Sequence, residues 1–258
     1  MPVDKNSPRI YNAGMEQEEK IKKLAEMLKN ARHAVFFGGA GVSTASGLPD
    51  FRSPDGLAGR KYKWPFEIML SHEFFFAHTA EFYDYYFKEL DLPGIKPNAA
   101  HLSLARLEDA GMIKAVITQN IDGLHQAAGS RNVIELHGTV SSAHCVRCNR
   151  KYDGEEVKRR APLPKCDCGG LIKPDVVLYG ESLDGTAINR ALEELDKADL
   201  VIVGGTSLAV YPAAGFLRET SGKIAVINKE AVAEDRADIV ILGNIAEILP
   251  CISYIAHR

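Results

Sequence analysis

The chain has 258 residues, of which 46% are hydrophobic and 25% charged, a balance typical of a folded globular protein with a sizeable core. Its net charge of -3 gives no basic excess, so direct nucleic-acid binding is not expected. No apolar run approaches the ~20 residues needed to cross a bilayer, and residues 1–14 lack the apolar core of a signal peptide. We therefore expect no membrane contact and a cytoplasmic protein.

Helical and strand patterns alternate along most of the chain. Residues 15–30 place Leu24, Ala25 and Leu28 on one apolar face of an expected helix. Short runs that are apolar throughout indicate strands covered on both faces, as in a parallel sheet flanked by helices. The sequence thus predicts an α/β fold with a Rossmann-like doubly wound parallel sheet. The apolar runs are residues 33–39, 114–122, 199–207, 223–228 and 238–242, and helical patterns lie between them at residues 98–111 and 187–198.

Aromatic side chains gather in one segment that interrupts this alternation. Residues 53–95 hold most of them, and Phe75, Phe82 and Tyr86 recur at the spacing of one helical face. We expect most of these rings to form the core of a helical subdomain, and a few near Tyr62 to line a cleft.

Cysteine pairs mark a second interruption, in residues 138–181. The spacing is Cys145-x2-Cys148, then 17 residues, then Cys166-x-Cys168. Four thiolates in two chelating pairs suit tetrahedral Zn²⁺ and leave no open position for water, so the metal is expected to be structural. Four unconnected thiols and a redox Cys-x-x-Cys pair are the less favoured alternatives.

These patterns together divide the chain into a Rossmann-like domain and a smaller zinc-binding and helical domain. The expected segments are 15–52, 96–137 and 182–258 for a discontinuous Rossmann-like domain, 53–95 for the helical subdomain and cofactor loop, and 138–181 for the zinc-binding module.

The fifth cysteine, Cys251, lies outside the pairs and is expected to be a buried lone thiol.

Two glycine-containing turns follow predicted strands. The first reads Gly39-x-Gly41, but Thr44 replaces the third glycine of a dinucleotide-binding motif. Its N–H groups and the start of an expected helix could bind a pyrophosphate, although a tight turn without ligand has the same pattern. A second turn at residues 204–207, and Asn228 at the end of another strand, favour nucleotide binding.

Polar residues also end the strand within 114–122. Gln119, Asn120 and Asp122 are costly to bury without partners, so they either satisfy one another or face a ligand. His137 follows in a mostly apolar run, where a histidine is by itself more often a satisfied core residue than a catalyst.

Several of these motifs resemble those of the sirtuins, which are NAD-dependent protein lysine deacylases. The resemblance covers about residues 20–250 and follows the family's order. The motifs are GAGVSTASGLPDFR (39–52), TQNID (118–122), HG (137–138), the paired cysteines, KPDVVLYGE (173–181), GTSL (205–208) and VIN (226–228).

The resemblance implies roles for individual residues, with NAD and Zn²⁺ as cofactors. His137 and Asn120 match catalytic residues of the family, and His137 would act as general base on a ribose hydroxyl. The residues that match the family's NAD contacts are Ala40, Thr44, Asp50, Phe51, Arg52, Gln119, Asn120, Ile121, Asp122, His137, Thr206, Ser207, Asn228 and Ile245. Those that match its substrate-pairing segment are Val176, Val177, Gly180 and Glu181.

The implied reaction transfers an acyl group from a protein lysine to ADP-ribose. Its products are nicotinamide, free lysine and O-acyl-ADP-ribose, and the expected partners are acyl-lysine proteins. Relatives that prefer succinyl groups carry a Tyr-x-x-Arg pair, which residues 58–64 lack although Arg60 is nearby, so acetyl and other uncharged acyl groups are expected. An NAD-dependent protein ADP-ribosyltransferase, a non-catalytic NAD-sensing scaffold and, less favoured, a dehydrogenase are the competing interpretations. The sequence makes no prediction of oligomeric state.

Overall fold

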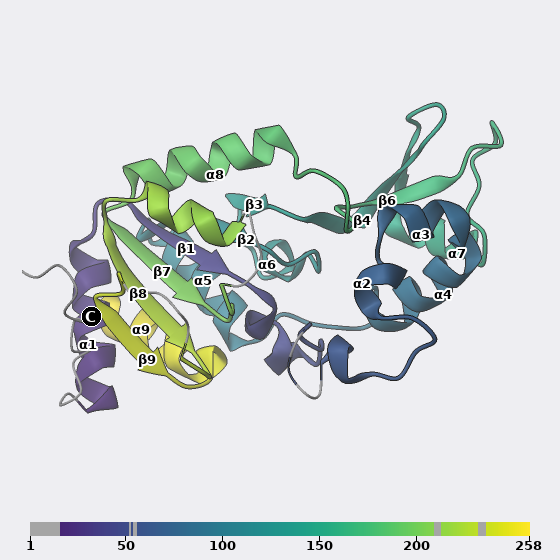
Figure 1. Cartoon of the computed structure of the whole chain (residues 1–258). Coiled ribbons are helices and arrows are strands. Elements are labelled where there is room, and N and C mark those ends of the chain that lie inside the picture. The colour runs from purple at the N-terminus through teal and green to yellow at the C-terminus, as the bar shows by residue number, and fades with distance from the viewer. Residues whose placement is uncertain (1–15, 52, 54–55, 209–212, 232–235) are drawn as a thin grey trace, which may run out of the picture.

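The computed structural model describes residues 16–51, 53, 56–208, 213–231 and 236–258 (Figure 1). Six parallel strands form its main sheet in the order β3-β2-β1-β7-β8-β9. The chain starts at the centre of this sheet and builds first one half and then the other, which is the doubly wound order and confirms the predicted fold class. The strands are β1 (Ala34–Gly38), β2 (Ile113–Thr118), β3 (Val133–Glu135), β7 (Leu200–Gly204), β8 (Lys223–Asn228) and β9 (Ile239–Leu242).

Helices cover both faces of the main sheet (Figure 1). In β1, Ala34 and Phe36 belong to one buried cluster, whereas Val35 and Phe37 belong to another. Every residue of β1 is buried because successive side chains point to opposite, covered faces, and this explains the uninterrupted apolar run. One face is covered by α1 (Gln17–Asn30), α5 (Ala99–Asp109) and α9 (Ile245–Ala256), and the other by α8 (Gly185–Lys197) and the 3-10 helix η4 (Ala213–Glu219).

A smaller layer, at the right of Figure 1, combines the aromatic and the cysteine-containing segments. Its three strands are antiparallel in the order β5-β4-β6. Phe75, Tyr83 and Ile172 belong to one buried cluster, and the Tyr83 hydroxyl donates to the Ile172 carbonyl at 2.5 Å. The two segments therefore share a core. The elements are α2 (Phe66–Met69), α3 (His72–Ala77), α4 (Thr79–Glu89), β4 (Gly138–Cys145), β5 (Lys151–Asp153), α7 (Gly154–Arg159) and β6 (Ile172–Val176).

Two local expectations were wrong. The helix expected after β1 is a pair of 3-10 turns, η1 (Ala40–Val42) and η2 (Thr44–Ser46). The aromatic face is divided between α3 and α4, because His78 leaves the helical region with φ -137° and ψ 49°.

Two further short elements are η3 (Leu57–Gly59) and α6 (Leu124–Ala127). No helix in the described ranges is long and apolar enough to span a bilayer.

Gly138 is a strict backbone requirement where the smaller sheet begins. Its φ is +76°, and a Cβ there would lie 1.9 Å from the Asp175 carbonyl oxygen. We expect Gly138→Ala to lower the free energy of unfolding by about 2–5 kcal/mol, the sum of a left-handed backbone and an overpacked contact. Denaturant unfolding measures this loss.

Gly94 supplies the matched control. Its φ is +75°, but nothing lies within 4 Å of an added Cβ. Gly94→Ala should therefore show only the backbone cost of about 1–2 kcal/mol. Equal losses for the two variants would contradict the assigned clash.

Candidate active site

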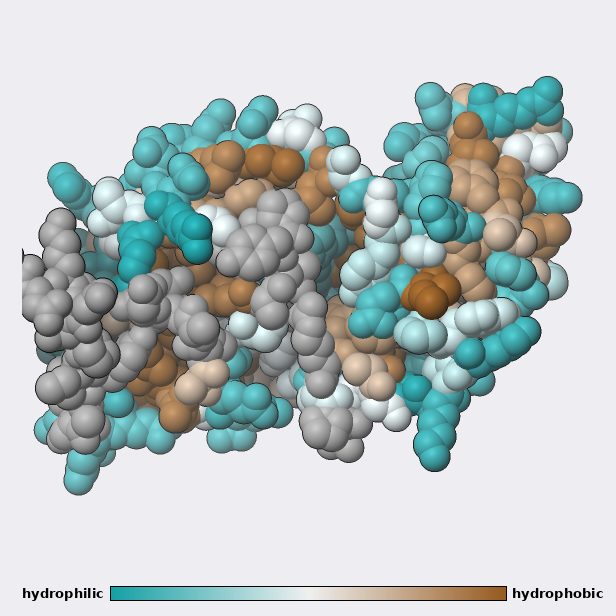
Figure 2. Space-filling view, in the orientation of Figure 1, coloured by the Kyte–Doolittle hydropathy of each residue, from teal (hydrophilic) through white to brown (hydrophobic). Residues whose placement is uncertain are grey.

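A cavity of about 990 Å³ lies between the carboxyl ends of the main-sheet strands and the smaller layer. The molecule is narrowed between these two layers, as Figure 2 also shows. The volume of the cavity is at the upper end of the range for ligand pockets, about 300–1,000 Å³. Arg52 lies outside the described residues. All the other predicted cofactor and substrate residues line the cavity: Ala40, Thr44, Asp50, Phe51, Gln119, Asn120, Ile121, Asp122, His137, Val176, Val177, Gly180, Glu181, Thr206, Ser207, Asn228 and Ile245.

The two glycine-containing turns lie against each other at the edge of this cavity. The Gly39 N–H donates to the Gly204 carbonyl at 3.2 Å, and the Gly41 N–H donates to the Gly205 carbonyl at 2.8 Å. A Cβ on Gly41 would lie only 2.8 Å from Gly205 Cα. Glycine is thus needed here for the approach of two backbones, and not for an α-helix whose positive end faces a phosphate.

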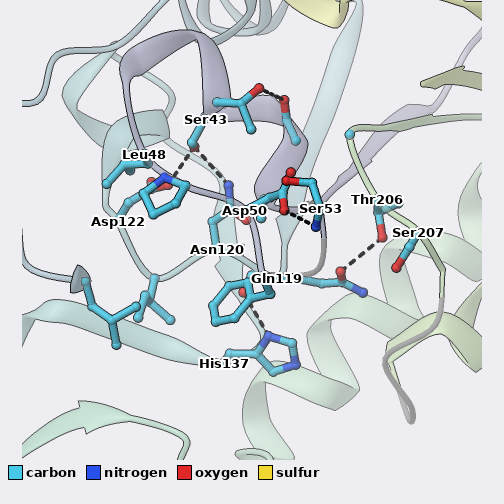
Figure 3. A pocket seen from close by; sticks show the side chains of 18 of the residues that line it. Ser43, Leu48, Asp50, Ser53, Gln119, Asn120, Asp122, His137, Thr206 and Ser207 are labelled. Atoms are coloured by element: carbon cyan, nitrogen blue, oxygen red, sulfur yellow. Dashed lines mark hydrogen bonds between the residues drawn. The ribbon is translucent and has the colours of Figure 1, made fainter. Parts of the chain in front are cut away.

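Ser43, for which the sequence alone predicts no role in the site, joins the polar residues at the end of β2. Its hydroxyl donates to Asp122 Oδ2 at 2.6 Å and accepts from Asn120 Nδ2 at 3.0 Å (Figure 3). His101 Nδ1 accepts from the Asn98 N–H, so Nε2 carries the proton, 3.4 Å from Ser43 Oγ. All donor and acceptor positions of the Ser43 hydroxyl are therefore used, which fixes Asn120 and Asp122.

A second buried histidine packs behind this network. The His101 and His125 ring centroids are 4.7 Å apart. Desolvation lowers the pKa of His101 to about 4 and that of His125 to about 3, so both rings are neutral at pH 7. No hydrogen-bond partner for either His125 ring nitrogen lies within the described part of the chain.

Gln119 connects the ends of three strands. Its N–H donates to the Gly38 carbonyl at 2.9 Å, and its Oε1 accepts from the Thr206 hydroxyl at 3.1 Å. Its Nε2 is buried and finds no partner in the described residues. A buried amide donor without a partner costs roughly 1–3 kcal/mol. Because Gln119 lines the cavity, a ligand carbonyl or hydroxyl could remove this cost.

His137 lies where the two layers meet, and its position fixes its tautomer. Nδ1 is 2.8 Å from the Gln119 carbonyl, which can only accept, so Nδ1 donates and Nε2 is left as the acceptor of the neutral ring (Figure 3). Desolvation lowers the pKa of His137, and the bond to Gln119 only partly opposes this. The imidazole is therefore neutral at pH 7 and able to accept a proton at Nε2.

The opposite wall of the cavity is the segment 176–181. The Val177 N–H donates to the His137 carbonyl at 2.9 Å, which attaches this wall to the histidine. The Val177 carbonyl and the Gly180 N–H form no backbone hydrogen bond with the described residues. The Glu181 carboxylate, in contrast, is occupied, since it accepts from the Leu178 N–H at 2.9 Å.

Of three further predicted residues beside the cavity, two have local hydrogen-bond partners and the third is buried. Asp50 Oδ1 accepts from the Ser53 N–H at 2.7 Å and so closes the loop that carries it. Asn228 Nδ2 donates to the Glu230 carbonyl at 2.9 Å. Ile245 is 3% exposed at the first position of α9.

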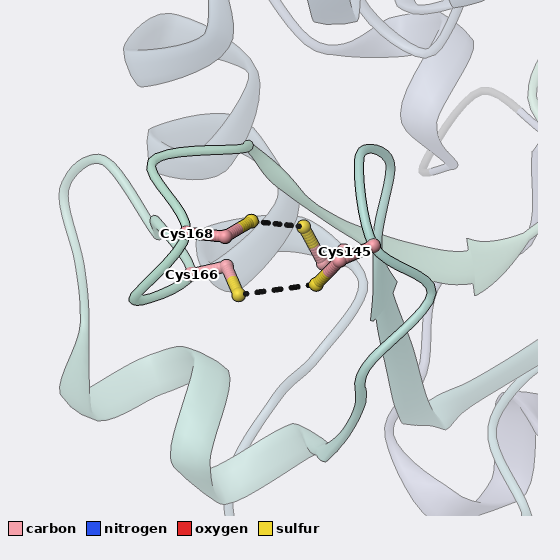
Figure 4. Close-up of side chains that lie close together, drawn as sticks. Cys145, Cys166 and Cys168 are labelled. Carbon is pink, nitrogen blue, oxygen red and sulfur yellow. Dashed lines mark hydrogen bonds between the residues drawn. The ribbon is translucent and has the colours of Figure 1, made fainter.

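The four paired cysteines come together at the far end of β4 and β6 (Figure 4). Their sulfur atoms all lie within 4.8 Å of one another, with 3.5 Å between Cys145 and Cys168 and 3.6 Å between Cys148 and Cys166. Tetrahedral zinc with Zn–S bonds of about 2.3 Å places its sulfurs about 3.8 Å apart. The set therefore fits Zn²⁺ and would fill its coordination sphere, despite the short Cys166-x-Cys168 spacing.

Cys251 was expected to be buried, and this was wrong. It is exposed, because it lies on the solvent side of α9, whereas Ile248, Leu249 and Ile252 face the core. Its sulfur is 3.4 Å from the Glu247 carbonyl one turn earlier.

The contrast between these cysteines gives a test of the metal site. Purified protein should contain about one zinc per chain, and Cys145→Ser should lose most of it because three thiolates hold zinc less tightly than four. Metal analysis by mass spectrometry measures the content. Cys251→Ser is the control and should keep its zinc, and equal zinc loss in both variants would contradict the assignment.

Comparisons with known proteins agree with this geometry. The family model described as "Sir2 family" matches residues 39–212. A Clostridium acetobutylicum protein named NAD-dependent protein deacetylase is 50% identical over 90% of this chain and 97% of its own length. A protein of the same name from Sulfolobus acidocaldarius is 45% identical over 90% of this chain and 93% of its own length.

Solved structures give the same result. A Sir2 structure with a deacetylated p53 peptide and 3'-O-acetyl ADP ribose has a TM-score of 0.83 and 40% identity, covering 90% of this chain and 96% of that one. A second structure, of Sir2 with a p53 peptide and NAD⁺, has a TM-score of 0.81 and 39% identity, covering 91% of this chain and 96% of that one. With the fold, the cavity and these matches in agreement, the chain belongs to the Sir2 family.

Proposed function

We propose that this protein is an enzyme that removes acetyl groups from lysine side chains of proteins and consumes NAD in doing so. The carrying observation is His137, a half-buried neutral imidazole whose Nδ1 is bound to the Gln119 carbonyl and whose ring lines the cavity shared by the polar network and the two glycine turns. The relatives named NAD-dependent protein deacetylase, at 50% and 45% identity, support the same activity.

When bound, NAD would supply the ribose carbon that the acyl oxygen attacks as nicotinamide leaves. Asn120 and Asp122, held by Ser43, would orient the nicotinamide and its ribose. The unpartnered amide of Gln119 would donate to the same group. Because these side chains are fixed before binding, little ordering is needed when the cofactor enters.

His137 would then receive a proton at Nε2 from a ribose hydroxyl. The Gln119 carbonyl stabilises the ring as it becomes positive, because Nδ1–H continues to donate to it. Apolar residues of the cavity such as Ile121 and Val176 would keep water from the ribose carbon until the acyl oxygen has attacked it. One water molecule would then be consumed as the lysine amine leaves, and the products are nicotinamide, free lysine and O-acetyl-ADP-ribose.

The other site residues predicted from the sequence take matching roles in this proposal. Segments 15–52, 96–137 and 182–258 would form the NAD-binding layer, with 53–95 and 138–181 as the helical and zinc-binding parts of the smaller one. The four cysteine thiolates would hold a structural Zn²⁺. Cofactor contacts would also come from Ala40, Thr44, Asp50, Phe51, Arg52, Ile121, Thr206, Ser207, Asn228 and Ile245.

The cysteines also bear on the compartment. Since free thiols persist in a reducing compartment, we place the protein in the cytoplasm, which cell fractionation would test.

The substrate would lie along the segment 176–181 as an added strand. The Val177 carbonyl and the Gly180 N–H are available for pairing with a peptide backbone. Such pairing is blind to side chains, so a broad range of acetyl-lysine sequences is expected.

The acyl group is expected to be uncharged. Glu89 is 3% exposed and lines the cavity, and its carboxylate is contacted by the Arg60 guanidinium and the Tyr62 hydroxyl. Arg60 is thus already paired, and an acyl chain with its own carboxylate would enter a cavity that has a carboxylate in its wall.

The activity is tested by an acetyl-lysine peptide with and without NAD. The parent should release nicotinamide and free lysine in equal amounts, and His137→Ala should lower kcat by at least about 100-fold, since it removes the general base. NAD affinity, measured by calorimetry, should change little.

The outcome also separates the competing activities. Label from NAD that is retained on the peptide would support ADP-ribosyl transfer, and NAD binding without nicotinamide release would support a sensing module. Either result would overturn deacetylation as the main activity.

Acyl preference is tested with matched acetyl and succinyl peptides. The acetyl peptide should have a kcat/KM at least about 10-fold higher, because an uncompensated buried charge costs more than 1.4 kcal/mol. Glu89→Gln should narrow this ratio, because it removes the wall charge and leaves Arg60 unpaired. Faster cleavage of the succinyl peptide by the parent would contradict the assignment.

A further inference from the structure

The beginning of α3 is joined to the cavity wall by reciprocal backbone bonds. The His72 N–H donates to the Tyr179 carbonyl at 2.9 Å, and the Tyr179 N–H donates to the Leu70 carbonyl at 3.0 Å. The N–H and the carbonyl of Tyr179 are thus both bonded to the helical segment. The wall therefore cannot shift without breaking contacts to α3.

A charged cluster of His72, Lys173 and Glu181 reinforces the bridge. His72 Nδ1 donates to Glu181 Oε1 at 2.9 Å, and Lys173 Nζ donates to Glu181 Oε2 at 2.9 Å. Although desolvation raises the pKa of Glu181, the hydrogen bonds from His72, the Leu178 N–H and Lys173 outweigh it and leave the pKa lowered. Glu181 is therefore an ionised carboxylate with partners on both oxygens.

Lys173 extends the cluster to the start of the wall. It is 8% exposed, and its Nζ also donates to the carbonyls of Val176 at 2.9 Å and Pro174 at 3.3 Å. One ammonium thus ties the end of β6 to the carboxylate of Glu181. The segment between them is held at both ends by the same ion pair.

This arrangement has a consequence for the proposed peptide site. Residues 177–180 lie outside the strands, and Gly180 has φ +89°, so regular sheet pairing does not fix their conformation. The groups available to a peptide, the Val177 carbonyl and the Gly180 N–H, lie within this segment. A loop that is ordered before binding loses less conformational entropy when the peptide pairs with it.

We infer that His72, Lys173 and Glu181 are positioning residues that hold the backbone of 177–180 ready to pair with the peptide substrate. The inference rests on the proposed function and reassigns Glu181, which was expected to contact substrate directly. The cluster would set peptide affinity and leave the reaction at His137 and the binding of NAD unchanged.

The test compares His72→Ala with His78→Ala. Both histidines lie in the helical segment, with side chains 48% and 44% exposed, and each has a carboxylate neighbour, but that of His78 is Glu81 of α4 at 3.8 Å, within the helical segment itself. His72→Ala should raise the peptide KM about 5–20-fold, as expected for loss of one charged hydrogen bond. kcat and the KM for NAD should change by less than about 2-fold, and His78→Ala should leave all three values near those of the parent.

His72→Asn supplies the rescue. The Asn Nδ2 can donate from nearly the position of Nδ1, so it should restore most of the peptide affinity. In a protein that already carries Glu181→Gln, His72→Ala should lower peptide affinity little further, because both substitutions remove the same interaction. Direct peptide binding, measured by fluorescence anisotropy, gives a second readout that does not require turnover.

The possible failures are distinguishable. An unchanged peptide KM and binding constant in His72→Ala, or an equal rise in both KM values with a fall in kcat, would overturn the positioning role while leaving deacetylation intact. A parent that binds the peptide but releases no lysine with NAD would overturn the proposed function, and the anisotropy series would still decide the role of the cluster. A parent that neither binds nor reacts would overturn both.

Discussion

Contact between two glycine-containing turns is the constraint on which the site depends. The Gly41 N–H bonds the Gly205 carbonyl at 2.8 Å, and no side chain fits between them. Because β1 and β7 are neighbouring parallel strands, this contact brings the chain leaving one strand against the chain leaving the other. Thr206 can then reach Gln119, and the loop after β1 delivers Ser43 to Asn120 and Asp122. The cavity is thus formed by backbone packing at one edge of the sheet.

His137 connects this edge to the smaller layer. Its side chain is bonded to the end of β2 through the Gln119 carbonyl, while its own carbonyl accepts from Val177 of the opposite wall. Gly138 follows at once, with a conformation that only glycine adopts easily. The residue proposed to accept the proton is therefore also the junction of the two layers. Its position is defined on both sides, which general-base catalysis requires.

Much of the fold was predictable, because the buried strands are continuous apolar runs and the cysteine spacing is specific to a metal site. Features that depend on contacts distant in sequence were not. The Gly41–Gly205 contact replaced an expected helix with 3-10 turns, and nothing local to Ser43 indicated that Asn120 and Asp122 would meet it. Cys251 was misplaced because a helix in which most residues are apolar gives a weak signal of which side faces solvent. The partners of Glu181 come from α3 and β6, so its motif alone could not reveal that its carboxylate is occupied.

The zinc-binding cysteines and the peptide wall share one pair of strands. β4 begins beside His137 and ends at Cys145, and its partner β6 covers the same span in four residue steps, so that roughly 13 Å separates the cavity from the cysteines. β6 likewise runs from Ile172, paired with Cys145, to Val176 at the wall. Loss of the metal would therefore act first on the strands that carry the wall, because Cys145 and Cys166 belong to the buried cluster of the smaller layer, whereas the main-sheet strands pack in two other clusters.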